Sequence, residues 1–390
     1  MATTKKKTPP TISDSTKEST LKRIPKTEYI ESGNVGLDIG FSNGKGIPRG
    51  ANIMFFGLPG TGKTTIFCDT IVRIMKRYKE AGIPMRMHYV DSESSRDLLE
   101  STGVMEYVYD KEEYAPQQVI YHEYVNSFSY LENLYTRMLT DKDNWNRDVH
   151  FVFIDSVTNL LSDSQLTEAV NKADFGDNAR IRKKLYGKWL QVIKEYQITQ
   201  FWSVQMSTKQ NVQMFEDPKK PAVSEFDKHE MDIICRLTAD KDTKKIDITK
   251  TKVHTIEGEK EILKKYLIKV DPGQAAHTKN RHGQNIPINI MLYPGHGIIN
   301  AYIIRKMLET YKLVNKVDSI NYSMSPEFAE YMGQEALEQA GITDINKFKR
   351  KPNLNRLCSL NNAKMIQYFK EHDMYKMVAK EEDEEDDGLF

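Results

Sequence analysis

The sequence predicts an α/β protein with a mostly parallel, twisted sheet flanked by helices. An apolar stretch at 51–56 is followed by a glycine-rich loop and then by an amphipathic helical pattern at 65–78. Further apolar stretches alternate with helical patterns as far as residue 205, which is typical of βαβ units. The run HFVFID at 150–155 is an apolar strand that ends in a carboxylate. Together these three observations favour parallel strands joined by helices.

The glycine-rich loop has the GxxxxGKT pattern of phosphate-binding loops and reads Gly57-Leu58-Pro59-Gly60-Thr61-Gly62-Lys63-Thr64. Glycines let backbone N–H groups approach phosphate oxygens, and the N-terminus of the following helix favours negative charge. Lys63 can reach the β- and γ-phosphates of a nucleotide, and the Thr64 hydroxyl can bind Mg²⁺. We therefore predict that these eight residues and Thr65 hold a nucleotide.

Carboxylates follow two of the predicted strands. The strand at 85–93 ends in Asp91 and Glu93, and the strand at 150–156 contains Asp155. Ligands of parallel sheets bind at the carboxyl ends of the strands. Because residues two apart on a strand point the same way, we expect Asp91 and Glu93 to face the same side. A carboxylate there can activate water, although an ordinary solvated pair stays an alternative; Asp155 is the expected Mg²⁺ ligand.

The remaining elements of the core continue the pattern. Strands are predicted at 117–125 and 199–205, the second ending in Gln205, and helices at 128–139 and 179–196. The helix at 179–196 carries a basic face that includes Arg180, which is either solvated or turned toward DNA. Antiparallel strands are expected to extend the sheet at 232–237, 245–251, 266–270 and 286–292.

Two polar segments are predicted to be loops, at 162–177 and at 208–229. The second is long and basic, and a long connection without secondary structure inside a compact domain is usually functional. It contains Lys209, Lys219, Lys220 and Lys228 and one aromatic residue, Phe215.

The 390 residues divide into four predicted parts: a basic arm at 1–28, a core at 29–299, a small helical domain at 300–378 and an acidic tail at 379–390. The net charge of +1 identifies no partner. The three cysteines, Cys68, Cys235 and Cys358, form no close-spaced pair, which excludes a zinc site and suits a reducing cytosol. No stretch has the length and apolar character of a membrane span or signal peptide, so a cytoplasmic protein is expected.

The tail has seven consecutive acids before Gly388-Leu389-Phe390. Three interpretations stay open. The tail keeps the protein soluble, or its acids cover the basic loops of this chain and compete with DNA. Alternatively, Phe390 and the acids dock on a partner, because the ending is similar to the tips of single-stranded-DNA-binding proteins.

In this order, the motifs GLPGTGKTT, YVDSES, FVFIDSVTNLL, FWSVQMS, NVQMFEDP and TKNR resemble those of the RecA-type recombinase family, most of all the phage UvsX recombinases. The resemblance covers roughly residues 30 to 300 and implies a RecA-like P-loop ATPase core. It implies an ATP-dependent recombinase that forms filaments on single-stranded DNA and promotes pairing and strand exchange with homologous duplex DNA. The implied cofactors are ATP and Mg²⁺, and a single-strand-binding or mediator protein is the implied helper.

The resemblance also assigns roles to individual residues. Glu93 is expected to activate water, and Gln205 to sense the γ-phosphate and relay its presence to the next loop. Lys279 and Arg281 are expected to reach the ATP of a neighbouring subunit, and Asp97 to contact the adenine. The segments at 162–177 and 208–229 correspond to the two DNA-binding loops, which makes Lys209, Gln210, Phe215, Lys219 and Lys220 the candidate DNA contacts of the second. Basic side chains bind phosphates, and an aromatic side chain can stack on or insert between bases.

Two other functions remain open from the sequence. A hexameric replicative helicase shares the same kind of ATPase core, but residues 1–30 are too short for its usual helical collar. A recombination mediator or regulatory ATPase is the second alternative, and the basic segment at 208–229 argues mildly against a pure protein binder. A filament and a ring both use ATP sites between subunits, so the sequence leaves both open.

Overall fold

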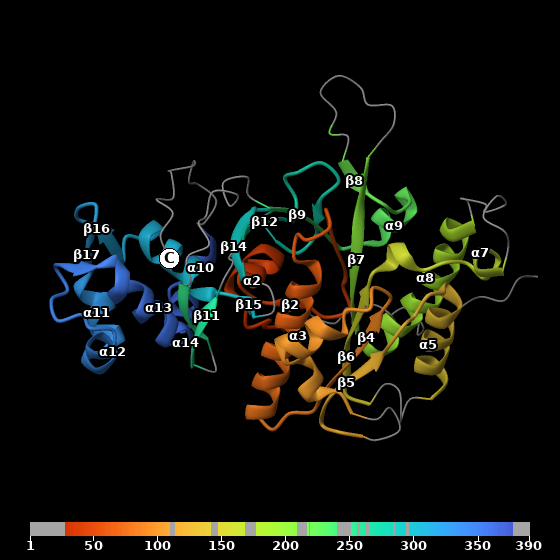
Figure 1. The fold of residues 1–390 in the computed structure, drawn as a ribbon, viewed down its shortest axis with the longest axis horizontal. Helices are drawn as coiled ribbons and strands as arrows, with labels where there is room; N and C mark the ends of the chain where they lie inside the picture. The colour runs from red at the N-terminus through yellow and green to blue at the C-terminus, as the bar shows by residue number, and fades with distance from the viewer. Residues whose placement is uncertain are drawn as a thin grey trace, which may run out of the picture.

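The computed structural model describes residues 28–109, 114–141, 147–167, 177–208, 217, 219–239, 251–255, 258–262, 266–283, 285–293 and 296–376. Within these residues the chain is an α/β protein with one large sheet that carries helices on both faces (Figure 1). The basic arm up to residue 27 and the acidic tail lie outside the described residues. None of the helices in this part of the chain is both long and apolar enough to cross a membrane.

The large sheet has a parallel centre and an antiparallel extension. Its strands are β3 (Asn52–Gly57), β4 (Met85–Asp91), β5 (Gln117–His122), β6 (Val149–Asp155), β7 (Thr199–Thr208), β8 (Lys219–Pro221), β9 (Ile233–Ala239), β12 (Tyr266–Asp271), β13 (Lys279–Asn280), β14 (Ile288–Tyr293) and β15 (Gly297–Ile298). The strands β5-β4-β6-β7-β3-β9 are neighbours in this order and run parallel. Antiparallel pairing continues from β9 through β12 and β14 to β15. The predicted mostly parallel sheet is thus confirmed.

One predicted strand direction is wrong. The strand predicted at 232–237 to be antiparallel is β9, which pairs parallel with β3, with Gly57 beside Leu237. The helix α9 (Glu225–Glu230) lies between β8 and β9 and returns the chain to the start of the sheet. Such a crossover makes the next strand parallel. The strands predicted at 266–270 and 286–292 are antiparallel as expected.

Small elements surround the large sheet. They are β1 (Tyr29–Ile30), β2 (Ile47–Pro48), α4 (Arg96–Thr102), η1 (Val104–Tyr107), η2 (Val157–Asn159), α7 (Asp163–Thr167), β10 (Thr251–Thr255) and β11 (Gly258–Ile262). The strands β1 and β2 form one antiparallel pair, and β10 and β11 form another. The strand predicted at 245–251 lies outside the described residues except for Thr251, where β10 begins.

Alternating side chains of the sheet enter two hydrophobic cores. In β3, Ile53 and Phe55 belong to one core, and Met54 and Phe56 belong to the other. Residues of α2 (Val35–Ser42), α3 (Lys63–Glu80) and α10 (Asn300–Thr310) complete the first core, and residues of α5 (Phe128–Thr140) and α8 (Asp177–Tyr196) complete the second. The two-residue period of a strand explains this division.

The helix α2 is an element that the sequence did not predict. All its residues are buried, and Asn34 caps it by accepting a hydrogen bond from the N–H of Leu37. A β-carbon on Gly36 would lie 2.8 Å from the side chain of Ile290. Glycine therefore lets this helix pack closely on the sheet, and tertiary packing outweighs the low helix propensity of glycine.

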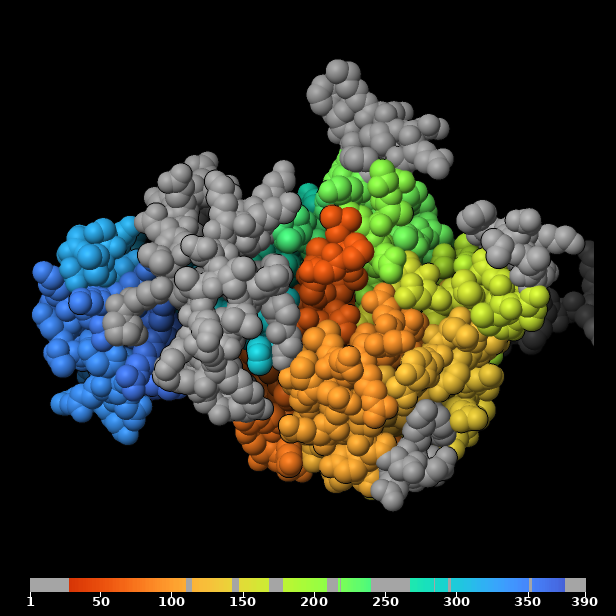
Figure 2. Space-filling model, in the orientation of Figure 1, coloured from red at the N-terminus to blue at the C-terminus, as the bar shows by residue number. Residues whose placement is uncertain are grey.

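The C-terminal elements are mostly helical, as predicted, but they include a small antiparallel sheet that the sequence analysis did not predict. They are β16 (Val314–Lys316), β17 (Asn321–Met324), α11 (Pro326–Met332), α12 (Gln334–Gln339), β18 (Phe348–Lys349), η5 (Arg350–Leu354), α13 (Asn355–Leu360), α14 (Asn362–Glu371) and η6 (Met374–Lys376). Figure 2 shows this part in blue at one end of the molecule. Its buried residues belong to the same hydrophobic core as those of α3. The domain boundary at residue 300 therefore stays a prediction.

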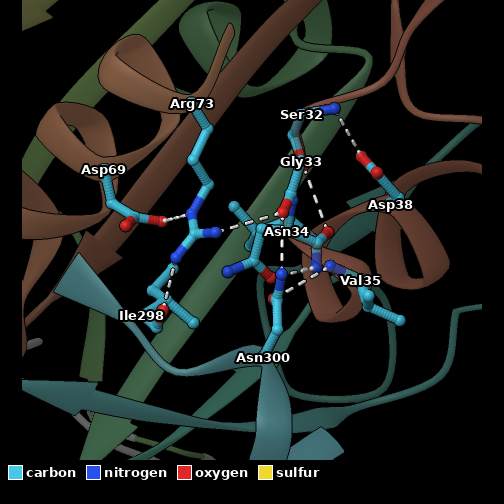
Figure 3. A network of polar contacts seen from close by, with 10 residues as sticks. Ser32, Gly33, Asn34, Val35, Asp38, Asp69, Arg73, Ile298 and Asn300 are labelled. Atoms are coloured by element: carbon cyan, nitrogen blue, oxygen red, sulfur yellow. Dashed lines mark hydrogen bonds and ion pairs between the residues drawn. The ribbon is translucent and has the colours of Figure 1, made fainter. Parts of the chain in front are cut away.

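Polar contacts fasten α3 to the segment before α2 and to the junction of β15 and α10 (Figure 3). Arg73 pairs with Asp69 at 2.7 Å and donates to the carbonyl of Ile298 at 2.6 Å. The side chain of Asn300 donates to the carbonyl of Gly33 at 2.8 Å. These contacts fix the helix that begins at the glycine-rich loop.

Candidate functional site

The carboxyl ends of the parallel strands bring four predicted site residues to one edge of the sheet. Gly57 at the end of β3 lies beside Gln205 of β7, and Asp91 at the end of β4 lies beside Asp155 at the end of β6. The order β3-β7-β6-β4 places these strands side by side. Since neighbouring strands lie about 4.8 Å apart, the four residues form a row about 14 Å long.

The loop between β3 and α3 joins this edge of the sheet to the start of a helix. Gly60 and Gly62 have positive φ angles of 76° and 84°. A β-carbon on Gly62 would also lie 2.6 Å from the side chain of Leu292, so this position requires glycine. The helix begins at Lys63 without a side-chain cap, and a helix N-terminus of this kind binds anions. Of the other predicted loop residues, Leu58, Pro59 and Gly60 are exposed, and Thr61 and Thr65 are buried.

The Lys63 ammonium lies over the loop. Its Nζ donates to the carbonyls of Gly57 at 3.2 Å and Leu58 at 3.3 Å. Burial lowers the pKa of Lys63, while the nearby charges of Asp155 and Glu93 oppose this shift. A buried ammonium beside the N–H groups at the start of α3 is suited to bind an anionic ligand such as a phosphate.

Asp155 is fully buried, and one of its two oxygens is well held. Its Oδ2 accepts a hydrogen bond from the Thr64 hydroxyl at 2.6 Å and another from the Tyr89 hydroxyl at 3.0 Å. Its Oδ1 has no hydrogen-bond partner among the described residues. Burial raises the pKa of Asp155 to about 6, and the charge of Glu93 adds to the effect, while the hydroxyls of Thr64, Ser203 and Tyr89 oppose it.

The oxygens of Thr64 and Asp155 are chemically suited to Mg²⁺. This ion prefers oxygen ligands and is usually held by one or two carboxylates together with substrate phosphates and water. Burying a carboxylate oxygen without a hydrogen-bond partner costs free energy, and a bound cation would offset this cost. The described part of the chain has no cluster of three or more His, Cys, Asp or Glu side chains that could hold a metal ion.

Asp91, the last residue of β4, and Glu93, which follows the strand, have different roles. The strand ends at Asp91, whose buried carboxylate accepts the N–H groups of Glu93 and Ser95 and the Tyr121 hydroxyl. Glu93 lies in the turn that follows and is exposed. The expectation that both acids continue the strand and face the same way is therefore wrong. Asp91 stabilises the turn that presents Glu93.

Glu93 faces two amide side chains. The Nε2 of Gln205 lies 3.5 Å from its Oε1, and the Nδ2 of Asn159 lies 3.4 Å from the same oxygen. The sequence analysis predicted Glu93 and Gln205 but missed Asn159. Asn159 follows Asp155 by four residues in the run FVFIDSVTNLL, so its closeness to the predicted metal ligand was the available signal.

Lys279 and Arg281 lie at the other end of the strands. The Nζ of Lys279 donates to carbonyls at the end of α9, and Arg281 pairs with Asp232 at 2.9 Å. The N–H of Asp232 donates to the carbonyl of Asn52 at the start of β3. Gly57 lies five residues further along this strand, about 16 Å away. The structure therefore does not bring Lys279 and Arg281 to the loop of their own chain.

The predicted DNA-contacting residues are only partly described. Arg180 is exposed near the start of α8, and Lys219 and Lys220 lie in β8, which pairs with the last residues of β7. Lys209, Gln210 and Phe215 lie outside the described residues. Asp97 is exposed in the first turn of α4, where contact with adenine stays a prediction.

Both predicted loops contain some secondary structure. The helix α7 occupies the start of the segment 162–177, whose continuation after Thr167 lies outside the described residues. The segment 208–229 includes β8 and most of α9, so the prediction of a long connection without secondary structure is wrong. The side chains of Ser224 and Asp227 form a capping box that starts α9. This pattern reads S-x-x-D, a weaker signal than the usual Glu or Gln at the last position.

Comparison with known proteins gives no match, either to a protein-family model or to a curated protein. The function is therefore argued from the arrangement of Lys63, Thr64, Glu93, Asp155 and Gln205.

Proposed function

We propose that this chain is a Mg²⁺-dependent ATPase of the RecA type that forms filaments on single-stranded DNA and pairs them with homologous duplex DNA. The observation that carries the proposal is the hydrogen bond between the Thr64 hydroxyl and Asp155. It joins the end of the GxxxxGKT loop to a buried carboxylate on another strand. In ATPases with this loop, a hydroxyl and a carboxylate in these positions hold Mg²⁺ beside the phosphates.

The loop and its lysine are the proposed binding site for the phosphates of ATP. The N–H groups at the start of α3 and the Lys63 ammonium supply positive charge at the same place. Mg²⁺ held by Thr64 and Asp155 would offset further negative charge of the phosphates. The exposed loop residues 58–60 leave the site open to a ligand from solvent.

Glu93 is the proposed general base of ATP hydrolysis. A water oxygen bonds to the γ-phosphorus, the bond to the bridging oxygen breaks, ADP keeps the electron pair, and the water proton passes to the Glu93 carboxylate. The support is geometric, because Glu93 is the exposed carboxylate at this edge and two amides lie near its Oε1. Such contacts orient a base toward the water that it deprotonates.

Gln205 is proposed to couple ATP to DNA. It lies on β7, which continues without a break to Thr208 and there pairs with the basic strand β8. A contact of Gln205 with the γ-phosphate in place of Glu93 would act on this strand just before its carboxyl end, where Ser207 pairs with Lys220 and Thr208 with Lys219. Basic residues at that end would bind DNA phosphates by releasing counterions.

The position of Lys279 and Arg281 supports a site that two subunits share. They cannot serve the loop of their own chain about 16 Å away along β3, whereas a neighbouring subunit could receive them. Cations supplied by a neighbour stabilise charge on a transferred phosphoryl group. ATP would then also stabilise the contact between subunits in a filament.

Negative-stain electron microscopy of the full chain with single-stranded DNA and a non-hydrolysable ATP analogue tests the proposal. We expect helical filaments on the DNA, and none in a matched sample without nucleotide. Closed rings would instead indicate a helicase-type motor. Absence of any DNA-bound assembly would indicate a regulatory ATPase and contradict the recombinase proposal.

A further inference from the structure

The Tyr89 side chain is the second hydroxyl donor to Asp155, and it lies outside the GxxxxGKT loop and the run HFVFID. It is fully buried in β4, and its ring stacks with Phe153 of β6 at a centroid distance of 6.4 Å. A phenylalanine could fill this volume and keep the ring contact. Only the hydroxyl, 3.0 Å from Oδ2 of Asp155, requires tyrosine.

The register of the two strands creates this contact. Tyr89 lies beside Phe153 in the parallel pairing of β4 and β6, so Asp155 follows two residues further along the neighbouring strand, on the same face. Thr64 approaches the same carboxylate oxygen from the start of α3. Two donors from different elements thus hold Oδ2, and Oδ1 is left without a partner in the described part of the chain.

We propose that Tyr89 is a positioning residue for the metal-binding carboxylate, because its hydroxyl fixes the rotation of the Asp155 side chain and leaves Oδ1 for Mg²⁺. The inference rests on the proposed function, since it requires Mg²⁺ and nucleotide at this site. Thr64 is itself a proposed metal ligand. Tyr89 donates to the same oxygen without a proposed contact to the metal, so its role is to orient that carboxylate.

The Tyr89 hydroxyl acts on the site through its hydrogen bond to Asp155. Without it, the carboxylate loses one of the two donors at Oδ2 and can turn more freely about its side-chain bonds. Removing a group that orients a metal ligand lowers metal affinity by about 10–100-fold.

The variant Tyr89→Phe tests the inference, because it deletes the hydroxyl and keeps the ring. The dissociation constant of a fluorescent, non-hydrolysable ATP analogue is measured with the full chain in EDTA and in saturating Mg²⁺. We expect the gain in affinity on adding Mg²⁺ to fall about tenfold in the variant. The constant in EDTA should not change, because the hydroxyl contacts Asp155 and not the phosphate loop.

The variant Tyr121→Phe is the matched control. Tyr121 lies on β5 beside Tyr89, and its hydroxyl donates to Asp91 at 2.8 Å. The control therefore also removes a tyrosine hydroxyl, but on the neighbouring strand. This variant should keep the full Mg²⁺-dependent gain. Binding of Mn²⁺ in place of Mg²⁺, counted by electron paramagnetic resonance, gives a second readout that does not involve turnover. Melting temperatures of both variants show that the fold is retained.

The outcomes separate the inference from the function on which it rests. A Mg²⁺-dependent gain in Tyr89→Phe equal to that of the wild type overturns the positioning role. An equal loss in Tyr121→Phe also overturns it, because any hydroxyl in this core would then matter. A wild-type chain that binds no nucleotide in either buffer contradicts the proposed function itself.

Discussion

The Thr64 hydroxyl donates a 2.6 Å hydrogen bond to Asp155, although 91 residues separate the two in the sequence. The contact requires α3 to start at the loop after β3 and β6 to end two strand positions away, beyond β7. It places a helix N-terminus, a lysine and a buried carboxylate at one point of the sheet edge. The proposed ATPase chemistry requires these three groups to lie close together.

The proposed base is tested by Glu93→Gln, which keeps the shape of the side chain and removes its basicity. We expect ATP binding to persist and turnover to fall at least about 10²-fold, the scale on which loss of a general base acts. The control is Glu100→Gln, an exposed glutamate on α4 that pairs with Arg96. A parallel loss of binding and turnover in the Glu93 variant would mean that Glu93 is structural.

The buried Asp155 should destabilise the folded chain at neutral pH. Burial raises its folded-state pKa from 3.8 to about 6, so the folded state holds the proton more tightly than the unfolded state. Stability from this group is present below about pH 4 and is lost as pH rises through about 6. A shift of this size corresponds to about 3 kcal/mol.

Asp155→Asn should therefore raise the melting temperature at about pH 7.5 and leave it unchanged at about pH 4, while ATP hydrolysis is lost. Calorimetry in the absence of nucleotide and metal measures the difference. Asp97→Asn, an exposed change on α4, is the control and should change neither value. A gain in melting temperature that is larger at the lower pH would show that the sign of the effect is wrong.

The trans role of Lys279 and Arg281 predicts complementation between inactive variants. The double alanine variant should lack ATPase activity alone, because it cannot complete a neighbour's site. Mixed with Lys63→Ala, it should regain part of the activity, since one kind of mixed interface has both halves intact. Lys279 also binds carbonyls of α9, so the melting temperature of the double variant is needed as a control. Absence of rescue at every mixing ratio would count against the trans role.

The basic strand β8 predicts a salt-dependent contact with DNA. Changing Lys219 and Lys220 to alanine should weaken single-strand binding and reduce the slope of log affinity against log salt by up to about two. The matched control replaces Lys76 and Lys79, which lie toward the far end of α3, away from the loop. Fluorescence anisotropy over a salt series measures both. Equal slopes for the two double variants would remove β8 from the DNA-binding surface.

The sequence predicted the site residues that belong to local motifs and missed those that depend on register. The GxxxxGKT loop and the run HFVFID are each readable within one segment. The hydrogen bond of Tyr89 to Asp155 needs the pairing of β4 with β6, which no local pattern contains. The capping of the Glu93 turn by Asp91 is equally hidden, because a strand pattern does not show where the strand ends.

The fold shows the same limit. The apolar run Ile233-Ile234-Cys235 indicates a strand at β9, but such a run does not show in which direction the strand pairs. Its parallel direction depends on α9, a helix of six residues within a polar segment. The three strands of the C-terminal sheet have two to four residues each, too few to show a period.

ATP hydrolysis by the purified full chain, with and without single-stranded DNA and compared with Lys63→Ala, tests the proposed ATPase site most directly. We expect hydrolysis that requires Mg²⁺ and rises with DNA, and its loss in the variant, because the lysine supplies an electrostatic contact worth about 3–4 kcal/mol in sites of this kind. Equal turnover in the variant and the wild type, or no hydrolysis by the wild type under any of these conditions, would contradict the proposed site.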